Sequence, residues 1–250
     1  MSVQGDFGFL SSGDSWRGVV ARGDRTNDIV CADCMDYAER VDNSSFDFML
    51  TDPPYSMPAT YAVNGSGTAI TQREMRKYSD HLIMRWWFSH FLAAWLPKMK
   101  PDCFMAIFCD LKSLSSFYPP LYERANIMHL LTWQKNTLMG GAVRKNSEQI
   151  LLAQFGAPRY NSGTFTSVIP VPSVPSAKRL HPVEKPYRLF EILIQQFAPA
   201  EDAWVIDPFG GGCITHFAAR GLGRNSLTIE YEPEFVDRAT EKHNGLYGRH

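Results

Sequence analysis

The chain alternates between short apolar runs and longer segments whose apolar positions recur at helical spacing. Short apolar runs bounded by polar or turn-forming residues are typical of buried strands, and helical spacing is typical of helices packed on a sheet. The pattern predicts strands over residues 28–32, 46–50, 103–109, 126–133, 149–155, 203–206 and 226–229. Strands that alternate with helices favour an α/β fold with a mostly parallel sheet.

Helices are predicted over residues 85–96, 186–197 and 215–220. The first contains Trp86, Trp87 and Trp95, which we interpret as core residues and not as a platform for stacking bases. Residues 156–176 are rich in Pro, Ser and Gly, which predicts a long functional loop or a flexible insert. We expect an N-terminal tail over 1–27 and a single domain over 28–250.

Composition narrows the class of protein. The 250 residues are 44% apolar, enough for a full core, and the net charge of −1 gives no global basic field. Any contact with a polyanion must therefore be local. The start of the chain lacks a basic-then-apolar layout, and Arg85 and His90 interrupt the most apolar run, so neither a signal peptide nor a membrane span is predicted.

The five cysteines are an odd number scattered through apolar segments, which fits reduced thiols in a cytosolic protein. Cys31 and Cys34 form a C-x-x-C pair, but no second pair of Cys or His has the spacing of a zinc site. We predict no metal.

A glycine-rich turn lies between a predicted strand and a predicted helix. It reads Asp207-Pro208-Phe209-Gly210-Gly211-Gly212, and Glu230 follows 18 residues later at the end of the next strand. Glycines let a backbone approach a ligand, and an acidic residue at that distance can accept the hydroxyls of a ribose. The turn predicts an adenosine-type cofactor site, although a tight glycine turn of any α/β protein has the same sequence pattern.

A second candidate, Asp52-Pro53-Pro54-Tyr55, follows a predicted buried strand. Two prolines stiffen the backbone and remove two N–H donors. Asp52 and the Pro53 carbonyl can accept the hydrogens of an incoming amine, and the Tyr55 ring can stack on a base rotated out of a duplex. The alternative is an Asx-Pro turn with a surface tyrosine.

Asp52-Pro53-Pro54-Tyr55 resembles the catalytic motif of amino-methyltransferases, and the chain resembles the beta group of DNA methyltransferases from about residue 28 to residue 243. In that group the catalytic motif precedes the cofactor motif. The further similar elements are Ala32-Asp33-Cys34, residues 95–107, Trp133-Gln134-Lys135-Asn136, Asn146-Ser147-Glu148, residues 181–186 and residues 207–215. The resemblance implies a Rossmann-like sheet with helices on both faces, a circularly permuted motif order and S-adenosylmethionine as cofactor.

The resemblance also implies roles for individual residues. Asp33 and Cys34 would lie by the cofactor adenine, and Glu230 would hold its ribose. The residues expected around the methionine end are Lys185, Asp207, Phe209, Gly211 and Thr215, and Asp52 and Gly212 are expected as further cofactor contacts. The rings of Phe209 and Tyr55 would favour a sulfonium by cation–π attraction. Asp33 as a simple helix cap and Lys185 as a solvated lysine at a helix start stay open as alternatives.

The chain departs from the family pattern at four positions. Cys213 stands where a second glycine is usual, Ser56 where asparagine follows the tyrosine, Ser147 at a frequent histidine and Ala32 at a glycine. None of these changes removes a group that the chemistry requires.

Aspartate at the first motif position accompanies adenine in the resembling family, so we expect N6 of adenine in DNA as the target and N4 of cytosine as the alternative. Cytosine C5 methylation needs a cysteine nucleophile, usually after proline, and the chain has no Pro-Cys pair. Glutamine methyltransferases use a related tetrapeptide, but they carry the cofactor motif first, so the motif order in this chain argues against them. A non-catalytic DNA-binding module, which Cys213 alone favours, and an RNA substrate stay open.

DNA contacts are expected in two loops, at about 56–80 and 156–180. The alternative is that the basic side chains of these loops are only solvated and do not contact DNA. The candidate basic residues are Arg73, Arg76, Lys77, Arg144, Lys178 and Arg179. The region between the motifs that would recognise the target sequence is short, which predicts a short or relaxed target, or a homodimer that shares the work. We expect a DNA-modification enzyme of the restriction-modification kind, with or without a restriction partner, acting on a flipped adenine in the cytoplasm of a bacterial, archaeal or viral host cell.

Overall fold

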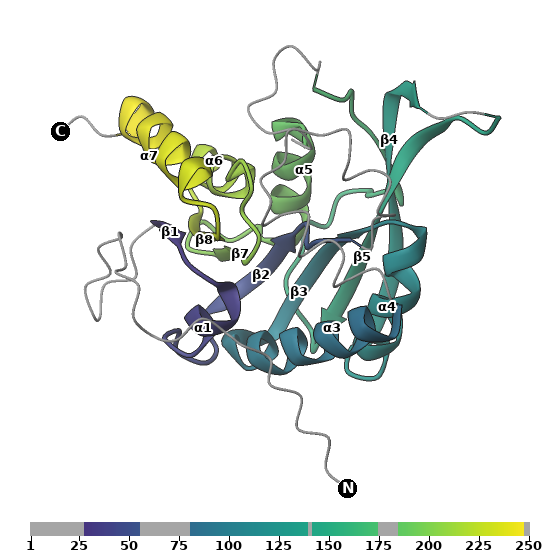
Figure 1. Cartoon of the computed structure of the whole chain (residues 1–250), viewed down its shortest axis with the longest axis horizontal. Coiled ribbons are helices and arrows are strands. Elements are labelled where there is room, and N and C mark those ends of the chain that lie inside the picture. Colours follow the sequence, from purple (N-terminus) through teal and green to yellow (C-terminus); the bar gives the residue numbers. More distant parts are fainter. Residues whose placement is uncertain (1–27, 56–80, 140–141, 175–184, 248–250) are drawn as a thin grey trace, which may run out of the picture.

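A computed structural model describes residues 28–55, 81–139, 142–174 and 185–247, and their strands form one eight-stranded sheet (Figure 1). Its spatial order is β1-β8-β7-β2-β3-β5-β4-β6. The strands are β1 (Asp28–Cys31), β2 (Phe46–Thr51), β3 (Met99–Cys109), β4 (Ile127–Met139), β5 (Lys145–Phe155), β6 (Val168–Pro170), β7 (Trp204–Asp207) and β8 (Asn225–Glu230).

The five strands from β1 to β3 in this order run parallel, and β5 is antiparallel to both β3 and β4. The expected mostly parallel α/β sheet is confirmed. Because β5 is reversed, its first residues lie at the carboxyl edge of the parallel strands, where Gln149 pairs with Cys109. This edge collects the ends of β1, β8, β7 and β2, where α/β proteins bind ligands.

Helices cover both faces of the sheet (Figure 1). They are α1 (Cys34–Ala38), α3 (His81–Trp95), α4 (Leu111–Tyr122), α5 (Tyr187–Phe197), α6 (Ile214–Gly221) and α7 (Pro233–Tyr247), with a short 3-10 helix η2 (Leu96–Lys98) after α3. Successive side chains of a strand point to opposite faces. Met49 of β2 accordingly packs in the core beneath α3, while Phe48 and Leu50 pack in the core beneath α5.

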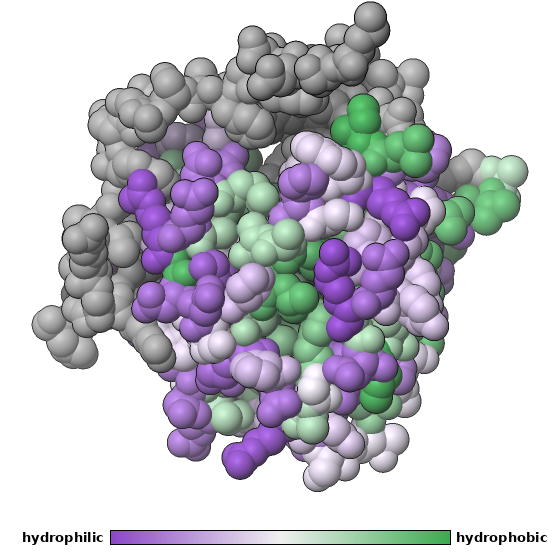
Figure 2. All heavy atoms as spheres, turned by 90° about the horizontal axis from the view of Figure 1, so that it is seen from below, coloured by the Kyte–Doolittle hydropathy of each residue, from purple (hydrophilic) through white to green (hydrophobic). Residues whose placement is uncertain are grey.

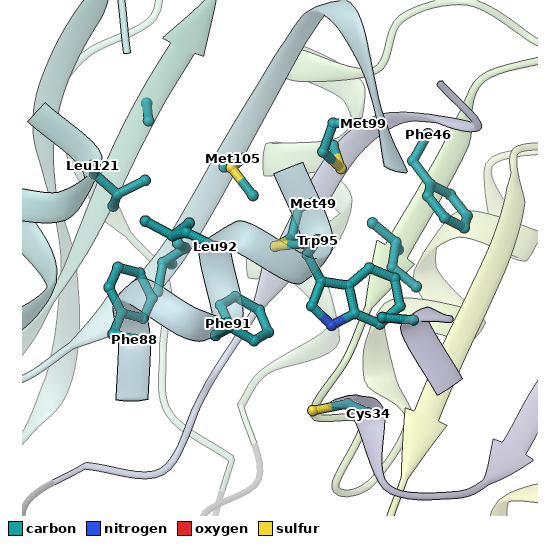
Figure 3. Close-up of a cluster of buried hydrophobic side chains, with 14 of the residues drawn as sticks. Cys34, Phe46, Met49, Phe88, Phe91, Leu92, Trp95, Met99, Met105 and Leu121 are labelled. Carbon is teal, nitrogen blue, oxygen red and sulfur yellow. The ribbon is translucent and has the colours of Figure 1, made fainter. Parts of the chain in front are cut away.

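The core beneath α3 is rich in aromatic residues (Figure 3). The buried residues of α3 recur at helical spacing and are Met84, Phe88, Phe91, Leu92 and Trp95. Burying a large apolar side chain contributes roughly 1.5–3 kcal/mol, so this one stripe fixes α3 on the sheet. The expectation for the tryptophans is confirmed for Trp95, which is fully buried, and is wrong for Trp86, which is 58% exposed.

On the face shown in Figure 2, hydrophilic and hydrophobic side chains are interspersed. None of the described helices is long and apolar enough to cross a bilayer.

Several elements differ from the sequence-based prediction. β3 begins at Met99 and continues through Pro101, and β6 lies within the segment predicted as loop over residues 156–176, where it pairs with β4. Helices α1, α4 and α7 were not predicted. Two prolines close to the end of α4 obscured its helical pattern, although its start is fixed by a capping box between Asp110 and Ser113.

His216 of α6 is fully buried and takes part in a chain of hydrogen bonds with Ser226 (2.9 Å) and His243 (2.8 Å). Burial, reinforced by the nearby His243 and Arg220, lowers the pKa of His216 to about 3. The unfolded chain binds a proton at this histidine below about pH 6.5, whereas the folded chain does not until about pH 3, so stability falls as the pH drops through this window.

We therefore expect His216 to reduce the free energy of unfolding by about 1.4 kcal/mol between pH 7.5 and pH 5.5. Urea denaturation at the two pH values measures this. His216→Gln should remove this part of the pH dependence, and His90→Gln, at an exposed position of α3, should keep it. An unchanged pH dependence in His216→Gln would show that the buried histidine is not its source.

Candidate active site

The two motifs that stand far apart in the sequence are neighbours at the carboxyl edge of the sheet. β2 leads into Asp52 and β7 ends at Asp207, and these parallel strands pair directly through Met49 and Ile206. The Thr51 hydroxyl donates a hydrogen bond to Asp207 (2.7 Å) across 156 residues of sequence. The motif predicted for the amine and the turn predicted for the cofactor are therefore joined in one site.

Asp52 is held from two sides. The Tyr55 hydroxyl donates to Oδ1 of Asp52, and Nζ of Lys185 donates to Oδ2. Burial, then the neighbouring Asp52 and Glu148, raises the pKa of Tyr55 well above its usual value, so the phenol stays protonated and remains a donor. Asp52 keeps 22% of its side chain exposed, which leaves the carboxylate accessible to a ligand.

Lys185 lies just before α5 and is buried between two carboxylates, because Oε2 of Glu148 lies 3.3 Å from its Nζ. Burial alone would lower the pKa of Lys185, but Asp52 and Glu148 outweigh it and the pKa is raised. The alternative of a solvated lysine is therefore excluded. The structure places Lys185 beside the predicted catalytic motif.

Glu148 of β5 and Lys135 of β4 extend this contact, since Nζ of Lys135 donates to Oε1 of Glu148. Burial would raise the pKa of Glu148, but Lys185 and Lys135 together lower it. The sequence analysis matched both residues to family elements without giving them a role at the site. The signal available in the sequence was a charged residue close to each of two apolar runs predicted as strands. Lys135 follows the run over residues 126–133, and Glu148 precedes the run over residues 149–155.

Asp207 is buried beneath the glycine turn. It accepts hydrogen bonds from the hydroxyls of Thr51 and Thr215 and from the backbone N–H of Phe209. Burial raises the pKa of Asp207 to about 6 in spite of these bonds, and Asp52 adds to the rise. Thr215 is itself fully buried, so in this structure it supports Asp207 and presents no surface to a ligand.

The glycine turn is open above Gly211, whose φ of +50° is unfavourable for other residues and where an added Cβ would meet nothing within 4 Å. Gly210 lies so close to β8 that a Cβ there would come within 2.5 Å of Thr228. Gly212 continues the turn and is half-buried. Cys213 caps α6 with a φ of +54° and is fully buried, so the turn accommodates this departure from the family pattern.

Glu230 closes the turn from β8. Its Oε2 accepts from the backbone N–H of Gly211 (2.6 Å), and its Oε1 accepts from that of Glu232 (2.8 Å). Burial raises the pKa of Glu230 although these two N–H groups oppose the rise. A carboxylate oxygen has two lone pairs, so each oxygen retains room for one more donor.

The first predicted cofactor element lies beside Glu230, because the Ala32 N–H donates to the Glu230 carbonyl (3.0 Å). Asp33 accepts a hydrogen bond from the Met35 N–H (2.7 Å) and so caps α1, which is one of the two interpretations given above for this residue. Cys34, the first residue of α1, is buried. On the other side of the turn, the half-buried Phe209 ring packs against Trp87, with ring centroids 5.7 Å apart.

The three carboxylates Glu230, Asp207 and Asp52 therefore follow one another along β8, β7 and β2. At one end of this edge Glu230 can accept hydrogen bonds from hydroxyl groups, and toward the other end lie Asp207, Asp52 and an aromatic ring. This arrangement suits a ligand with a ribose and a positive charge. Among the residues that the structure describes, no group of His, Cys, Asp and Glu is placed to hold a metal ion.

Of the predicted DNA-contacting residues, Arg144 is exposed and directly precedes β5 in the hairpin with β4 (Figure 1). The remaining five lie outside the described residues and are Arg73, Arg76, Lys77, Lys178 and Arg179.

The chain is similar to known DNA methylases. A family model described as DNA methylase, of the N6/N4 type, matches residues 154–241. The type II methyltransferase M.HpaI of Haemophilus parainfluenzae is 22% identical over 245 residues, which cover 86% of this chain and 73% of that protein.

Two solved structures share the fold. The complex of M1.HpyAVI with S-adenosylmethionine superposes with a TM-score of 0.62 at 22% identity, covering 86% of this chain and 98% of that one. PvuII DNA methyltransferase, described as cytosine-N4-specific, gives a TM-score of 0.64 at 15% identity, covering 88% and 91%.

Proposed function

We propose that this chain, a member of the N6/N4 family of DNA methylases, transfers a methyl group from S-adenosylmethionine to N6 of adenine in DNA. The observation that carries the proposal is the junction of two motifs, in which Thr51 bonds Asp207 and so places Asp52 next to the glycine turn. A site with only one of these motifs would explain either cofactor binding or amine binding, but not transfer between them.

The residues present fit the cofactor. Open space above Gly211 admits a ligand against the backbone, and the free lone pairs of Glu230 match two ribose hydroxyls. Asp207 places a carboxyl group beneath the turn, and the half-buried Phe209 ring lies near the opposite end. When bound, S-adenosylmethionine supplies a methyl group on a positively charged sulfur.

Asp52 would act on the amine of the target base. Because Tyr55 and Lys185 each use one lone pair of the carboxylate, Asp52 retains acceptor capacity for an amine N–H, and the Pro53 carbonyl is a second acceptor. Acceptors that hold the amine hydrogens direct the nitrogen lone pair toward the methyl carbon. Tyr55, fixed by its bond to Asp52, would lie against the flipped base.

The preference for adenine rests on Asp52, since aspartate at this position accompanies adenine in the resembling family. Cytosine N4 is the second candidate because PvuII DNA methyltransferase, a structural relative, is described as cytosine-N4-specific. Adenine and cytosine both present an exocyclic amine beside a ring nitrogen, so the same acceptors serve either base.

The proposal is tested by incubating the chain with labelled S-adenosylmethionine and unmethylated DNA, then identifying the labelled nucleoside by mass spectrometry. We expect N6-methyladenine in wild type and none with Asp52→Ala. Label in N4-methylcytosine would select cytosine N4 as the target. Label found only in RNA would show that the substrate is RNA and not DNA. Cofactor binding without transfer to any nucleic acid would support a non-catalytic binding module.

Arg144 and Lys145, both exposed at the start of β5, are proposed to contact DNA phosphates. A net charge of −1 predicts few such contacts and a modest dependence of DNA affinity on salt. Neutralising both residues to alanine should reduce the slope of log affinity against log salt by about 1–2.

Fluorescence anisotropy with a labelled duplex over a salt series measures this slope. The matched control replaces Lys98 and Arg124, which lie at the opposite edge of the sheet, where β3 and β4 begin, and should leave the slope unchanged. An equal slope in both double variants would place the DNA elsewhere.

A further inference from the structure

Four side chains of alternating charge form a continuous line into the site, in the order Lys135, Glu148, Lys185, Asp52. We call them the charge chain. Their side chains are 15%, 28%, 8% and 22% exposed, in that order, so all are largely removed from water. Lys185 contacts both carboxylates, and Glu148 contacts both lysines.

Buried ion pairs contribute little to the stability of a protein interior, because the free energy lost on removing the charges from water offsets most of their attraction. Apolar residues of similar volume often stabilise the fold equally well. The charge chain therefore calls for an explanation beyond stability. Its inner end is Asp52, the group that the proposed function places at the amine of the base, so that explanation is sought in the position of this carboxylate.

The outer half of the charge chain is rigid. Glu148 pairs with Trp133 in the β4–β5 ladder, and it directly precedes Gln149, from which β5 is also paired with β3. Nζ of Lys135 lies over the Trp133 ring, 4.5 Å from its centroid. Glu148 is thus fixed by its strand pairing, and Lys135, which follows the last regular pair of the ladder at Gln134, is held against the face of a buried tryptophan.

The inner half depends on that rigid frame. Asp52 lies in the loop after β2, and Lys185 lies two residues before the start of α5, outside any strand or helix. Nζ of Lys185 has Asp52 and Glu148 as ionic partners and the face of Phe108 at 5.1 Å. Oε2 of Glu148 has the Lys185 ammonium as its ionic neighbour without a well-aligned hydrogen bond, so the contact acts mainly through charge.

We propose that Glu148 is a positioning residue for methyl transfer, and that Lys135 supports it. Glu148 draws the Lys185 ammonium toward the sheet and so sets which oxygen of Asp52 the lysine occupies, leaving the other acceptor positions for the amine. Without Glu148, the ammonium is balanced by Asp52 alone and moves toward it, so the acceptor is both misplaced and more fully occupied. This inference rests on the proposed function of Asp52.

The test is Glu148→Gln, which keeps the size of the side chain and removes its charge. We expect the single-turnover rate of DNA methylation to fall about 10–10²-fold, the scale of misplacing a reacting group by about 1 Å. Affinity for S-adenosylmethionine should stay within about twofold of wild type. Lys135→Gln should act in the same direction with a smaller effect.

The control is Lys100→Gln, which removes another partly buried ion pair, with Asp47 (2.7 Å), where β2 and β3 begin at the far edge of the sheet. It should lower the melting temperature and leave the rate unchanged. Combining Glu148→Gln with Lys185→Met should be no slower than Lys185→Met alone, because Glu148 acts through Lys185. An unaltered rate in Glu148→Gln, or rates that simply multiply, would overturn the proposal.

A readout independent of activity separates this inference from the proposed function. Acetylation of Lys185 by an amine-reactive ester, followed by peptide mass spectrometry, should be slow in wild type and in Lys100→Gln, and faster in Glu148→Gln. A wild-type chain that methylates no nucleic acid would contradict the proposed function, and the labelling would then decide only whether Glu148 holds Lys185 in place. Unchanged protection of Lys185 in Glu148→Gln would contradict that role.

Discussion

Asp52→Ala is expected to reduce the single-turnover rate of methyl transfer by at least about 10²–10³-fold, the usual cost of losing one preorganised partner of a developing charge. An exocyclic amine is a poor nucleophile because its lone pair is delocalised into the ring. An acceptor on its N–H draws that lone pair back onto nitrogen, and it stabilises the positive charge that grows there. Loss of amine orientation adds to the effect.

The fold and much of the cofactor binding should survive in Asp52→Ala, because Asp207 and Glu230 keep all their own hydrogen bonds. Thermal melting and calorimetry with S-adenosylmethionine are the controls, and Asp36→Ala, at an exposed position of α1, is the matched acidic variant. A near-normal single-turnover rate in folded Asp52→Ala would show that this loop does not act on the amine.

Glu230→Ala is expected to weaken binding of S-adenosylmethionine by about 10²-fold. A hydrogen bond to a charged group contributes roughly 1.5–3 kcal/mol, and the proposal assigns Glu230 two ribose hydroxyls. The variant also releases the N–H groups of Gly211 and Glu232, which hold the turn in its present shape. Both effects reduce affinity.

Calorimetry of wild type and Glu230→Ala measures this loss, with melting temperature as the folding control. Glu234→Ala removes an exposed acid in the first turn of α7 and should bind the cofactor as wild type does. Equal affinity in folded Glu230→Ala and in wild type would exclude Glu230 as the ribose acceptor.

The parts of the fold that could be predicted are those with local signals. Apolar runs predicted strands close to β1, β2 and β7, and glycine residues next to a strand end predicted the cofactor turn. The family resemblance assigned Asp52, Asp207 and Glu230 to the same cofactor, and parallel strands place their carboxyl ends at one edge. The structure brings these three residues together.

The charge chain could not be predicted in the same way, because it depends on strand register. Glu148 reaches Lys185 only because β5 is antiparallel to β3, so that its first residues lie at the carboxyl edge. Lys135 reaches Glu148 through the pairing of Trp133 with Glu148. A shift of one residue would turn Glu148 to the other face of the sheet, and no local sequence pattern fixes that register.

Elements with few apolar residues were also missed. In α7 the described buried side chains are Val236 and Ala239, too few to give a clear helical period. β1, β8 and α6 supply the surface that this helix covers, and that surface exists only after the strands have paired.

Sequencing with base-modification detection, applied to DNA from cells that express the chain, tests the central claim most directly. Cells with the wild-type chain should carry N6-methyladenine at a defined short sequence, and cells with Asp52→Ala at equal protein level should not. N4-methylcytosine at the modified sites would contradict the assignment to adenine. DNA without any modification specific to the wild-type chain would contradict methyl transfer itself.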